Sequence, residues 1–375
     1  MTATSPFLTR RDERGSVMIM TAILMFGIIL AVGLCIDVSR VYMVRTELQN
    51  AADAAALSAA RELNSGASGI QDAVTRATGI INKLGFNRTN ISIAQVEFSV
   101  NLGGPYVSSA TAQATPSNIR FVRVTTQTTA TAMLFSARVL GATHTESRSA
   151  TAGMSVGINT ICDFFPMVVA LASDPAPNTP MTLKYLQGDP GANVVKDKDF
   201  TILEVPEISG NGEKETVQLA AGITHICKSI NDTLQITPSA NGNNGGKAIS
   251  WGANSRFDNP GRNYLDAATY PPDTNVRENI SFDQYKNRTA VTPPSQSPPG
   301  VDGRRILIVP IVTPGTYQAN PGPPTRRFGA FFLRKQVAAN GSLEVEWIDE
   351  TLVIGRGGYT PGGGTSNLTL PVLYK

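Results

Sequence analysis

The sequence predicts an α+β protein in which a long amino-terminal transmembrane helix continues into a small α+β unit, followed by a β-rich carboxyl-terminal domain. Three observations predict this fold. A strongly apolar run lies near the amino terminus, and a proline-free stretch of helix formers continues it. The prolines are concentrated in the second half: Pro6, Pro105 and Pro116 are the only ones before residue 166, of 24 in the chain.

Composition excludes several classes of protein. The chain has 375 residues, enough for two or three domains. Its hydrophobic content of 41% and charged content of 16% exclude a fully disordered chain, and its apolar residues do not form the many long runs of a polytopic membrane protein. The net charge of +3 argues against a nucleic-acid binder, so no nucleic-acid partner is expected.

Residues 15–36 carry no charge, and the strongly apolar residues 17–36 would form a helix of about 30 Å, the thickness of the hydrocarbon core of a bilayer. The alternatives are a cleavable signal peptide and a buried core helix. The run is longer than a signal-peptide core and offers no small-residue cleavage site around Cys35. The sequence therefore predicts an uncleaved, single transmembrane helix over residues 15–36, with the lipid bilayer as its partner.

The flanking charges predict the orientation of this helix. Arg10, Arg11 and Arg14 precede the apolar run, whereas Arg40 and Arg45 follow it. The excess of arginine before the run favours a cytoplasmic tail over residues 1–14. The body of the protein would then lie on the other side of the membrane.

The helix is expected to continue beyond the membrane. No proline occurs from residue 16 to residue 64, so one helix of about 49 residues would be roughly 70 Å long. Its second half is rich in alanine, which has the highest helix propensity and allows close approach of a neighbouring element. Apolar residues recur there at helical spacing and predict a packing stripe made of Val41, Leu48, Ala52, Ala55 and Ala59.

This region resembles the amino-terminal domain of the TadE/TadG-like Flp pilus-assembly family. The resemblance rests on the Glu13-Arg14-Gly15-Ser16 entry, the apolar span, Asp37 at its outer end and the LQNAADAAAL stretch over residues 48–57. It implies a bacterial inner-membrane protein of tight-adherence secretion, with a pilin-like unit in the periplasm and other pilus-assembly or secretion proteins as partners. Met20 stands where a processed prepilin would carry glutamate, which favours the uncleaved TadG-like branch.

The rest of the chain divides into two parts. Residues 37–158 are expected to form the helix extension and the pilin-like α+β unit, with a second helix over residues 65–88, strands, and a short helix over residues 131–140. Residues 159–375 are expected to form a β-rich periplasmic domain with a proline-rich loop at residues 288–303. Its candidate strands are residues 167–172, 181–186, 200–205, 216–219, 306–312, 328–333, 343–348 and 352–354.

Known catalytic motifs do not occur in the sequence. It lacks H-E-x-x-H, C-x-x-C and G-x-S-x-G, and its two histidines, His144 and His225, have no evident catalytic partners. We therefore predict no catalytic, cofactor-binding or metal-binding residues. Because the periplasm is oxidising, Cys162 and Cys227 are predicted to form a disulfide, and Cys35 to remain free. The alternative for the pair is two small, buried, unpaired residues.

Together these features predict a non-catalytic, inner-membrane-anchored component of Flp pilus assembly that presents a periplasmic body to other components. Two alternatives remain open at this stage: a minor pilin-like subunit of the fibre, and a membrane-tethered ligand-binding protein or enzyme. Homo-oligomerisation also remains open.

Overall fold

The structure is a computed structural model, which describes residues 14–80, 82–85, 88–137, 141–186, 194–204, 213–222, 227–236, 244–295, 299–318, 322–354, 357–358 and 366–374. The predicted fold class is confirmed: a long apolar helix leads into an α+β body that becomes β-rich towards the carboxyl terminus. The predicted cytoplasmic tail lies outside the described residues up to residue 13.

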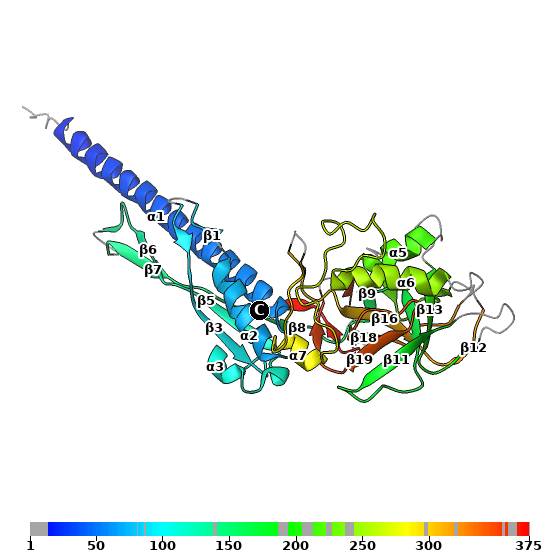
Figure 1. Cartoon of the computed structure of the whole chain (residues 1–375). Coiled ribbons are helices and arrows are strands. Elements are labelled where there is room, and N and C mark those ends of the chain that lie inside the picture. Colours follow the sequence, from blue (N-terminus) through cyan, green and yellow to red (C-terminus); the bar gives the residue numbers. More distant parts are fainter. Residues whose placement is uncertain are drawn as a thin grey trace, which may run out of the picture.

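Helix α1, Arg14–Arg61, is 48 residues long and projects from a body made of two lobes (Figure 1). Its amino-terminal half stands clear of the body, and its carboxyl-terminal half packs against the first lobe. The length agrees with the sequence prediction, because neither proline nor a turn signal interrupts the helix before residue 64.

The first lobe is a five-stranded sheet in the order β23-β8-β5-β3-β4, covered by α1 and α2. Alternate residues of its central strand β5 are buried, so one face of the sheet packs on the two helices. Helix α2, Ala67–Gly79, is shorter than the predicted helix over residues 65–88. The strands of this sheet are β3 Ile93–Ser99, β4 Val107–Ser108, β5 Phe121–Thr126, β8 Ser149–Met154 and β23 Pro371–Tyr374.

The last strand, β23, returns from the carboxyl end of the chain to pair with β8 of the first lobe. The predicted division of the chain at residue 158 therefore does not account for β23, which belongs to the sheet of the first lobe. The first lobe therefore contains both the beginning of the body and the last strand of the chain, which forms an edge of its sheet.

The helix predicted over residues 131–140 is wrong at its start, because residues 131–132 belong to a β-hairpin, and its last residues, 138–140, lie outside the described residues. Strand β6, Thr129–Ala132, pairs antiparallel with β7, Thr143–Glu146, and both contact α1. Thr131 and Ala132 pair with His144 and Thr143, so strand pairing with β7, and not local helical hydrogen bonding, decides the structure of these two residues. The hairpin lies alongside α1 (Figure 1).

Smaller elements complete the first lobe. Strands β1 and β2 form a short two-stranded ladder, and α3 and the 3₁₀ helix η1 precede β5. Their bounds are β1 Asn82–Lys83, β2 Asn90–Ile91, α3 Ser109–Ala112 and η1 Pro116–Asn118.

The second lobe is built on a sheet in the order β10-β16-β18-β19-β11-β13-β15. A further pairing of β10 with β13 closes the sheet on itself, so that β10, β16, β18, β19, β11 and β13 form a barrel. The two faces of these strands carry separate apolar clusters. The strands are β10 Met167–Ala170, β11 Pro180–Tyr185, β13 Asp199–Glu204, β15 Gln235–Ile236, β16 Ile306–Val312, β18 Arg327–Leu333 and β19 Leu343–Ile348.

Six of the predicted strands in this lobe coincide with strands of the structure, and β20, Leu352–Val353, corresponds to the predicted strand at residues 352–354. The predicted strand at residues 216–219 is wrong, because this segment belongs to helix α5, Glu213–Ala221. Helix α6, Asn244–Asn254, packs against α5 and was not predicted, since its first turn contains two glycines. Three further short strands of this lobe are β12 Val194–Val195, β17 Gly315–Thr316 and β22 Leu368–Thr369.

Between residues 255 and 305, the described part of the chain contains only two short helices, the 3₁₀ helix η2 Ser255–Phe257 and α7 Phe282–Lys286. Buried arginines attach this segment to the rest of the lobe. Arg305, which is fully buried, donates to the carbonyls of Asn275, Arg277, Leu333 and Arg334 at 2.8–3.0 Å. Such donors satisfy buried carbonyls that no helix or sheet can pair, and they fix an irregular segment in place.

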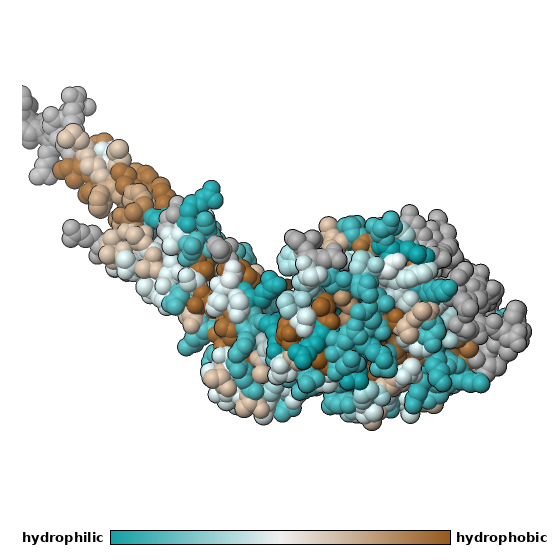
Figure 2. Space-filling model, viewed as in Figure 1, coloured by the Kyte–Doolittle hydropathy of each residue, from teal (hydrophilic) through white to brown (hydrophobic). Residues whose placement is uncertain are grey.

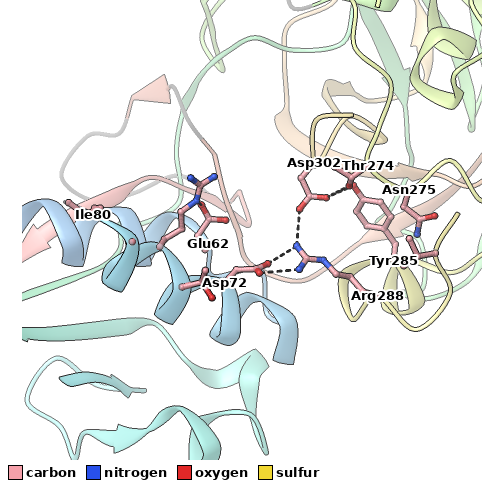
Figure 3. Close-up of a pocket in the computed structure, with 12 residues that line it drawn as sticks. Glu62, Asp72, Ile80, Thr274, Asn275, Tyr285, Arg288 and Asp302 are labelled. Atoms are coloured by element: carbon pink, nitrogen blue, oxygen red, sulfur yellow. Dashed lines mark hydrogen bonds and ion pairs between the residues drawn. The ribbon is translucent and has the colours of Figure 1, made fainter. Parts of the chain in front are cut away.

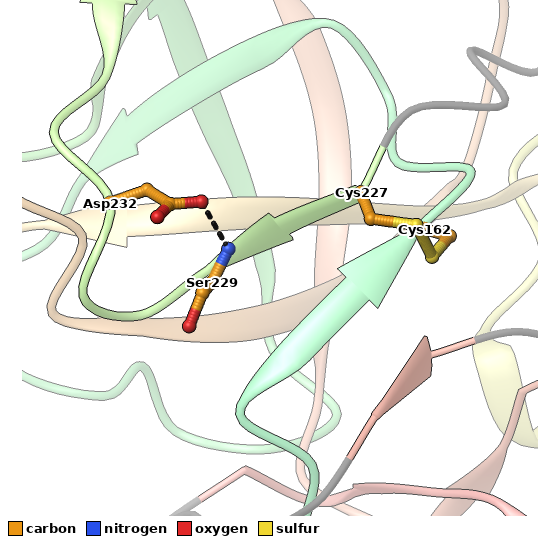
Figure 4. Close-up of a disulfide and its surroundings, with 4 residues drawn as sticks. All are labelled: Cys162, Cys227, Ser229 and Asp232. Carbon is orange, nitrogen blue, oxygen red and sulfur yellow. Dashed lines mark hydrogen bonds between the residues drawn. A yellow bond between two sulfur atoms is a disulfide. The ribbon is translucent and has the colours of Figure 1, made fainter.

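Cys162 and Cys227 are joined by a disulfide that closes a separation of 65 residues (Figure 4). Strand β9, Thr160–Cys162, pairs antiparallel with β14, Cys227–Ser229, so the two cysteines face each other directly across the ladder. On its other side β9 pairs with β21, Gly357–Gly358. Cys35 is free and exposed on α1.

We predict that alkylation of the denatured, unreduced protein modifies Cys35 alone, whereas prior reduction exposes all three cysteines. The reason is the register of β9 and β14, which brings Cys162 and Cys227 opposite each other. A closed loop of this length stabilises a fold by about 4 kcal/mol in the chain-entropy description. Mass spectrometry of protein isolated from its native envelope provides the measurement. Three modified cysteines without reductant would contradict the disulfide.

Candidate functional site

The amino-terminal half of α1 presents an apolar surface on all sides. The large apolar side chains from Val17 to Ile36 are 41–75% exposed. Figure 2 shows this brown surface running along the projecting helix towards the body. The helix is long and apolar enough to cross a membrane. Soluble proteins rarely expose a contiguous apolar surface as large as this one.

The other half of α1 is buried in the first lobe. Of the predicted packing stripe, Leu48, Ala52, Ala55 and Ala59 have no exposed surface, and Val41 is half-buried. The buried surface is wider than the stripe, since it also includes Val44, Ala51, Ala56 and Ala60. Small side chains at these positions let α2 and the sheet contact the helix on two sides.

Asp37 lies at the junction between these two halves and is 1% exposed. Its carboxylate accepts hydrogen bonds from the backbone amides of Leu134, Phe135 and Ser136 at 2.7–2.9 Å, and from the Ser136 hydroxyl at 2.8 Å. Three successive amides that point at one anion form a binding concavity for it. The carboxylate thereby fixes the turn of the β6–β7 hairpin to α1.

Gly33, one helical turn before Asp37, provides the space for this contact. A Cβ atom at this position would lie 2.5 Å from the Cβ of Phe135 and 2.6 Å from its Cγ, so any larger residue would push the Phe135 side chain away. Gly27, by contrast, has no atom within 4 Å of the same position. The two glycines of the apolar segment therefore differ, and only Gly33 is required by packing within the chain.

The hydrogen bonds at Asp37, first that from the Ser136 backbone, lower its pKa below the usual value, although burial acts in the opposite direction. A carboxyl with a lowered pKa in the folded state stabilises the fold above the pKa of the unfolded carboxyl, about 3.9, and loses this contribution as the pH falls. At neutral pH the contact between the hairpin and α1 is therefore made by a charged carboxylate.

We predict that Asp37→Asn loosens the hairpin from α1. The amide replaces one accepting oxygen with a donor, and a hydrogen bond to a charged acceptor contributes about 1.5–3 kcal/mol. Hydrogen exchange of the Leu134, Phe135 and Ser136 amides should then become faster by about tenfold to a hundredfold. The measurement is exchange mass spectrometry of the purified protein in detergent.

Asp53→Asn is the matched control on the same helix. Its carboxylate accepts one bond, from Gln49 Nε2 at 2.8 Å, and asparagine keeps an accepting oxygen at this site. The control should leave exchange at residues 134–136 unchanged. Equal exchange in both variants and in the parent would show that Asp37 does not hold the hairpin.

A second candidate site is a cleft of about 620 Å³ where the two lobes meet. Figure 3 shows that Glu62 and Asp72 line it from the first lobe, and Thr274, Arg288 and Asp302 from the second. Beside it, the Ser68 hydroxyl donates to the Lys286 carbonyl, and other polar contacts also join α2 to the residues around α7. The cleft is therefore part of the joint between the lobes.

The charged groups of this cleft are paired with one another. Arg288 makes two parallel hydrogen bonds to Asp72, at 2.7 and 3.0 Å, and lies 3.5 Å from Asp302. Arg76 pairs with Glu62 at 3.0 Å. A planar guanidinium between two carboxylates from different lobes gives a directional contact. The ion pair of Arg288 with Asp72 therefore joins the two lobes across the cleft.

A buried acidic group, Asp273, lies behind the cleft and is bonded to two of its lining residues, Asn275 and Tyr285. It accepts hydrogen bonds from the Asn275 amide, the Tyr285 hydroxyl and the Arg305 amide at 2.8–3.1 Å. Burial raises the pKa of Asp273 to about 6, and its hydrogen bonds and the nearby Arg305 charge oppose this rise. Its three hydrogen bonds position Tyr285 and the segment around Arg305.

Within the described residues, no group of three or more His, Cys, Asp and Glu side chains is placed to hold a metal ion. His144 lies exposed on β7, and His225 falls outside the described residues. The sequence indicates Asp37 and the stripe on α1, but not the partner of Asp37 at residues 134–136. Nothing local to those residues indicates the contact, because it joins positions almost 100 residues apart.

The described chain is thus a two-lobed body on one helix that is long and apolar enough to span a membrane. Residues 15–62 match the Tad family model, described as Flp pilus-assembly TadE/G-like, and this match coincides with α1. This match supports the resemblance of residues 15–62 to the TadE/G-like family that their sequence indicates. The match does not separate the TadG-like branch from the TadE-like one. No curated protein and no solved structure matches the chain significantly.

Proposed function

We propose that this protein is a single-pass, non-catalytic component of Flp pilus assembly, anchored in the inner membrane of a bacterium. Residues 15–36 cross the membrane with the amino terminus in the cytoplasm. The two lobes stand in the periplasm and contact other pilus-assembly or secretion proteins. The TadG-like branch fits this role best, because Met20 occupies the position of the glutamate in processed prepilins.

The observation that carries this proposal is the coincidence of the TadE/G-like match with α1. The matched segment includes the exposed apolar half of the helix, the Asp37 junction and the buried alanine-rich half. One rigid helix therefore connects the apolar segment to the body without a flexible linker. Such an arrangement holds a body at a fixed height and angle above a bilayer.

The cleft supports a structural role more than a catalytic one. Arg288, Asp72 and Asp302 neutralise each other there, and the ionisable Asp273 and Tyr285 are bonded to each other at 2.8 Å. A ligand-binding protein remains the second candidate, because the cleft at the joint is large enough for a small molecule. A minor pilin-like subunit is the third, and amino-terminal processing would favour it.

We predict that protease added to intact spheroplasts degrades the body after Arg40 and leaves an amino-terminal fragment protected. The reason is the excess of arginine before the apolar run. Epitope tags at the two ends, detected separately, provide the measurement, and a cytoplasmic protein is the control for lysis. Protection of the carboxyl-terminal tag until the cells are lysed would show that the orientation is the opposite of the one proposed.

The assembly role is tested by deleting the gene in its source bacterium and counting surface pili by electron microscopy. The full chain should restore pili, whereas a variant with residues 1–36 replaced by a cleavable signal peptide should release a folded body and fail to restore them. Normal piliation after deletion would refute the assembly role. Mass spectrometry of sheared pili distinguishes the candidates, because a fibre subunit would be present in them and an anchored component would be absent.

A further inference from the structure

The loop between β6 and β7 is described at residues 133–137 and 141–142. Residues 134–136, the tip that Asp37 holds, carry two apolar side chains that the body does not cover. Leu134 is 62% exposed and Phe135 is 48% exposed. They stand on the turn that Asp37 fixes to α1, so their position relative to the apolar helix is determined by four hydrogen bonds. A loop tip elsewhere on a soluble surface would normally carry polar residues.

The height of this tip along α1 can be derived from its contacts. Phe135 packs on Gly33, three residues before Ile36, the last apolar residue of the transmembrane segment. At 1.5 Å per residue this contact lies about 4.5 Å inside the outer end of that segment. Amphipathic elements that bind at a membrane surface bury their apolar side to about 5–10 Å. The tip therefore reaches the boundary between acyl chains and headgroups.

Polarity along the hairpin changes in the direction that a bilayer requires. The apolar tip lies at the level of residues 33–37 of α1. The base carries Glu146, which lies 4.0 Å from Arg45 of α1 and also pairs with Arg148. Arg45 is eight residues beyond Asp37, or about 12 Å farther from the membrane. The charged end of the hairpin thus stands in the aqueous phase when its tip is at the lipid.

Asp37 is placed so that a charge can exist at this boundary. A bare carboxylate there would be costly, because it would lose water without gaining a partner. The three amides and one hydroxyl of residues 134–136 replace that water. The same contact that solvates the carboxylate also brings Phe135 against Gly33, within the apolar part of α1.

We propose that the tip of the β6–β7 hairpin is a second membrane contact, in which Leu134 and Phe135 insert among the acyl chains of the leaflet nearest the body. This inference rests on the proposed role of α1 as a membrane anchor. The lipid, rather than another protein, is the occupant because the tip is continuous with the apolar surface of α1 and lies at its outer end. Two contacts at different points of the surface fix the rotation of the body about α1, which a single helix leaves free.

The test uses single-cysteine variants of the full chain in a Cys35→Ser background, with the disulfide left oxidised. An environment-sensitive fluorophore is attached to Leu134→Cys, and the protein is reconstituted into vesicles of phosphatidylethanolamine and phosphatidylglycerol. We expect the fluorophore to emit at a shorter wavelength than the same fluorophore in buffer. We also expect it to be quenched by lipids brominated in the upper acyl chain, and to be quenched severalfold less by aqueous iodide than a fluorophore at the control site.

The control site is Leu102→Cys, an apolar residue with 45% exposure. It follows the end of β3 that pairs with Phe121, whereas the hairpin follows the other end of β5, so Leu102 lies at the end of the sheet opposite the hairpin. A fluorophore there should respond to iodide and not to brominated lipid. A reporter at Leu24→Cys, in the middle of the apolar segment, measures the anchor itself.

The outcomes separate the two proposals. Lipid quenching at residues 24 and 134 but not at residue 102 supports the inference. Lipid quenching at residue 24 alone, with iodide quenching at residue 134, overturns the inference and leaves the anchor intact. Protection of residue 134 from both quenchers also overturns it, because a second protein copy would then cover the tip. Absence of lipid quenching at residue 24 would refute the anchor as well.

Discussion

The structure depends on one helix that has to satisfy two environments without a break. Over its first half α1 exposes large apolar side chains in every direction, and over its second half it is covered on two sides by α2 and a sheet. Leucine and isoleucine suit the first environment, and alanine suits the second because it permits close packing. Asp37 stands between them, where a charge would be unfavourable without the amides of residues 134–136. The rigidity of the whole arrangement follows from the absence of any linker between the two halves.

The joint between the lobes is polar, unlike the interior of either lobe. Side chains of α2 and of the residues around α7 meet through hydrogen bonds and ion pairs, among them the two parallel bonds from Arg288 to Asp72. Ion pairs at partly exposed sites contribute little to stability, but they define geometry well. Strand β23 adds a backbone connection, since it pairs with β8 of the first lobe. The two lobes are therefore positioned by directed contacts and by the path of the chain.

Inside the second lobe, buried arginines perform the task that regular hydrogen bonding performs elsewhere. Arg305 and Arg256 donate to carbonyls of irregular segments and of α5. A guanidinium offers five donors in one plane, so one side chain can satisfy several carbonyls at once. Long stretches rich in proline and glycine can remain ordered between strands because their polar groups have these partners.

The sequence predicted the features that depend on local composition. Apolar runs and alternation located α1, β16, β18 and β19 closely, since burial on both faces or on all sides leaves a continuous apolar pattern. The same approach failed at residues 131–132, which belong to strand β6 instead of the predicted helix, and at residues 216–219, where a helix replaces the predicted strand. In both segments local propensity is weak, and contacts with α1 or α6 decide the outcome.

By itself, therefore, the sequence determined the resemblance of α1 to the TadE/G-like family, the apolar helix and its continuation into the body, because these depend on uninterrupted runs of residues of one kind. Only the tertiary structure decided the closure of the barrel through β10 and β13, the return of β23, and the partner of Asp37. Each of these joins residues that are far apart in the chain. Their pairing is fixed by which strands and amides remain unpaired after the local elements have formed, and that information is not present in any single segment.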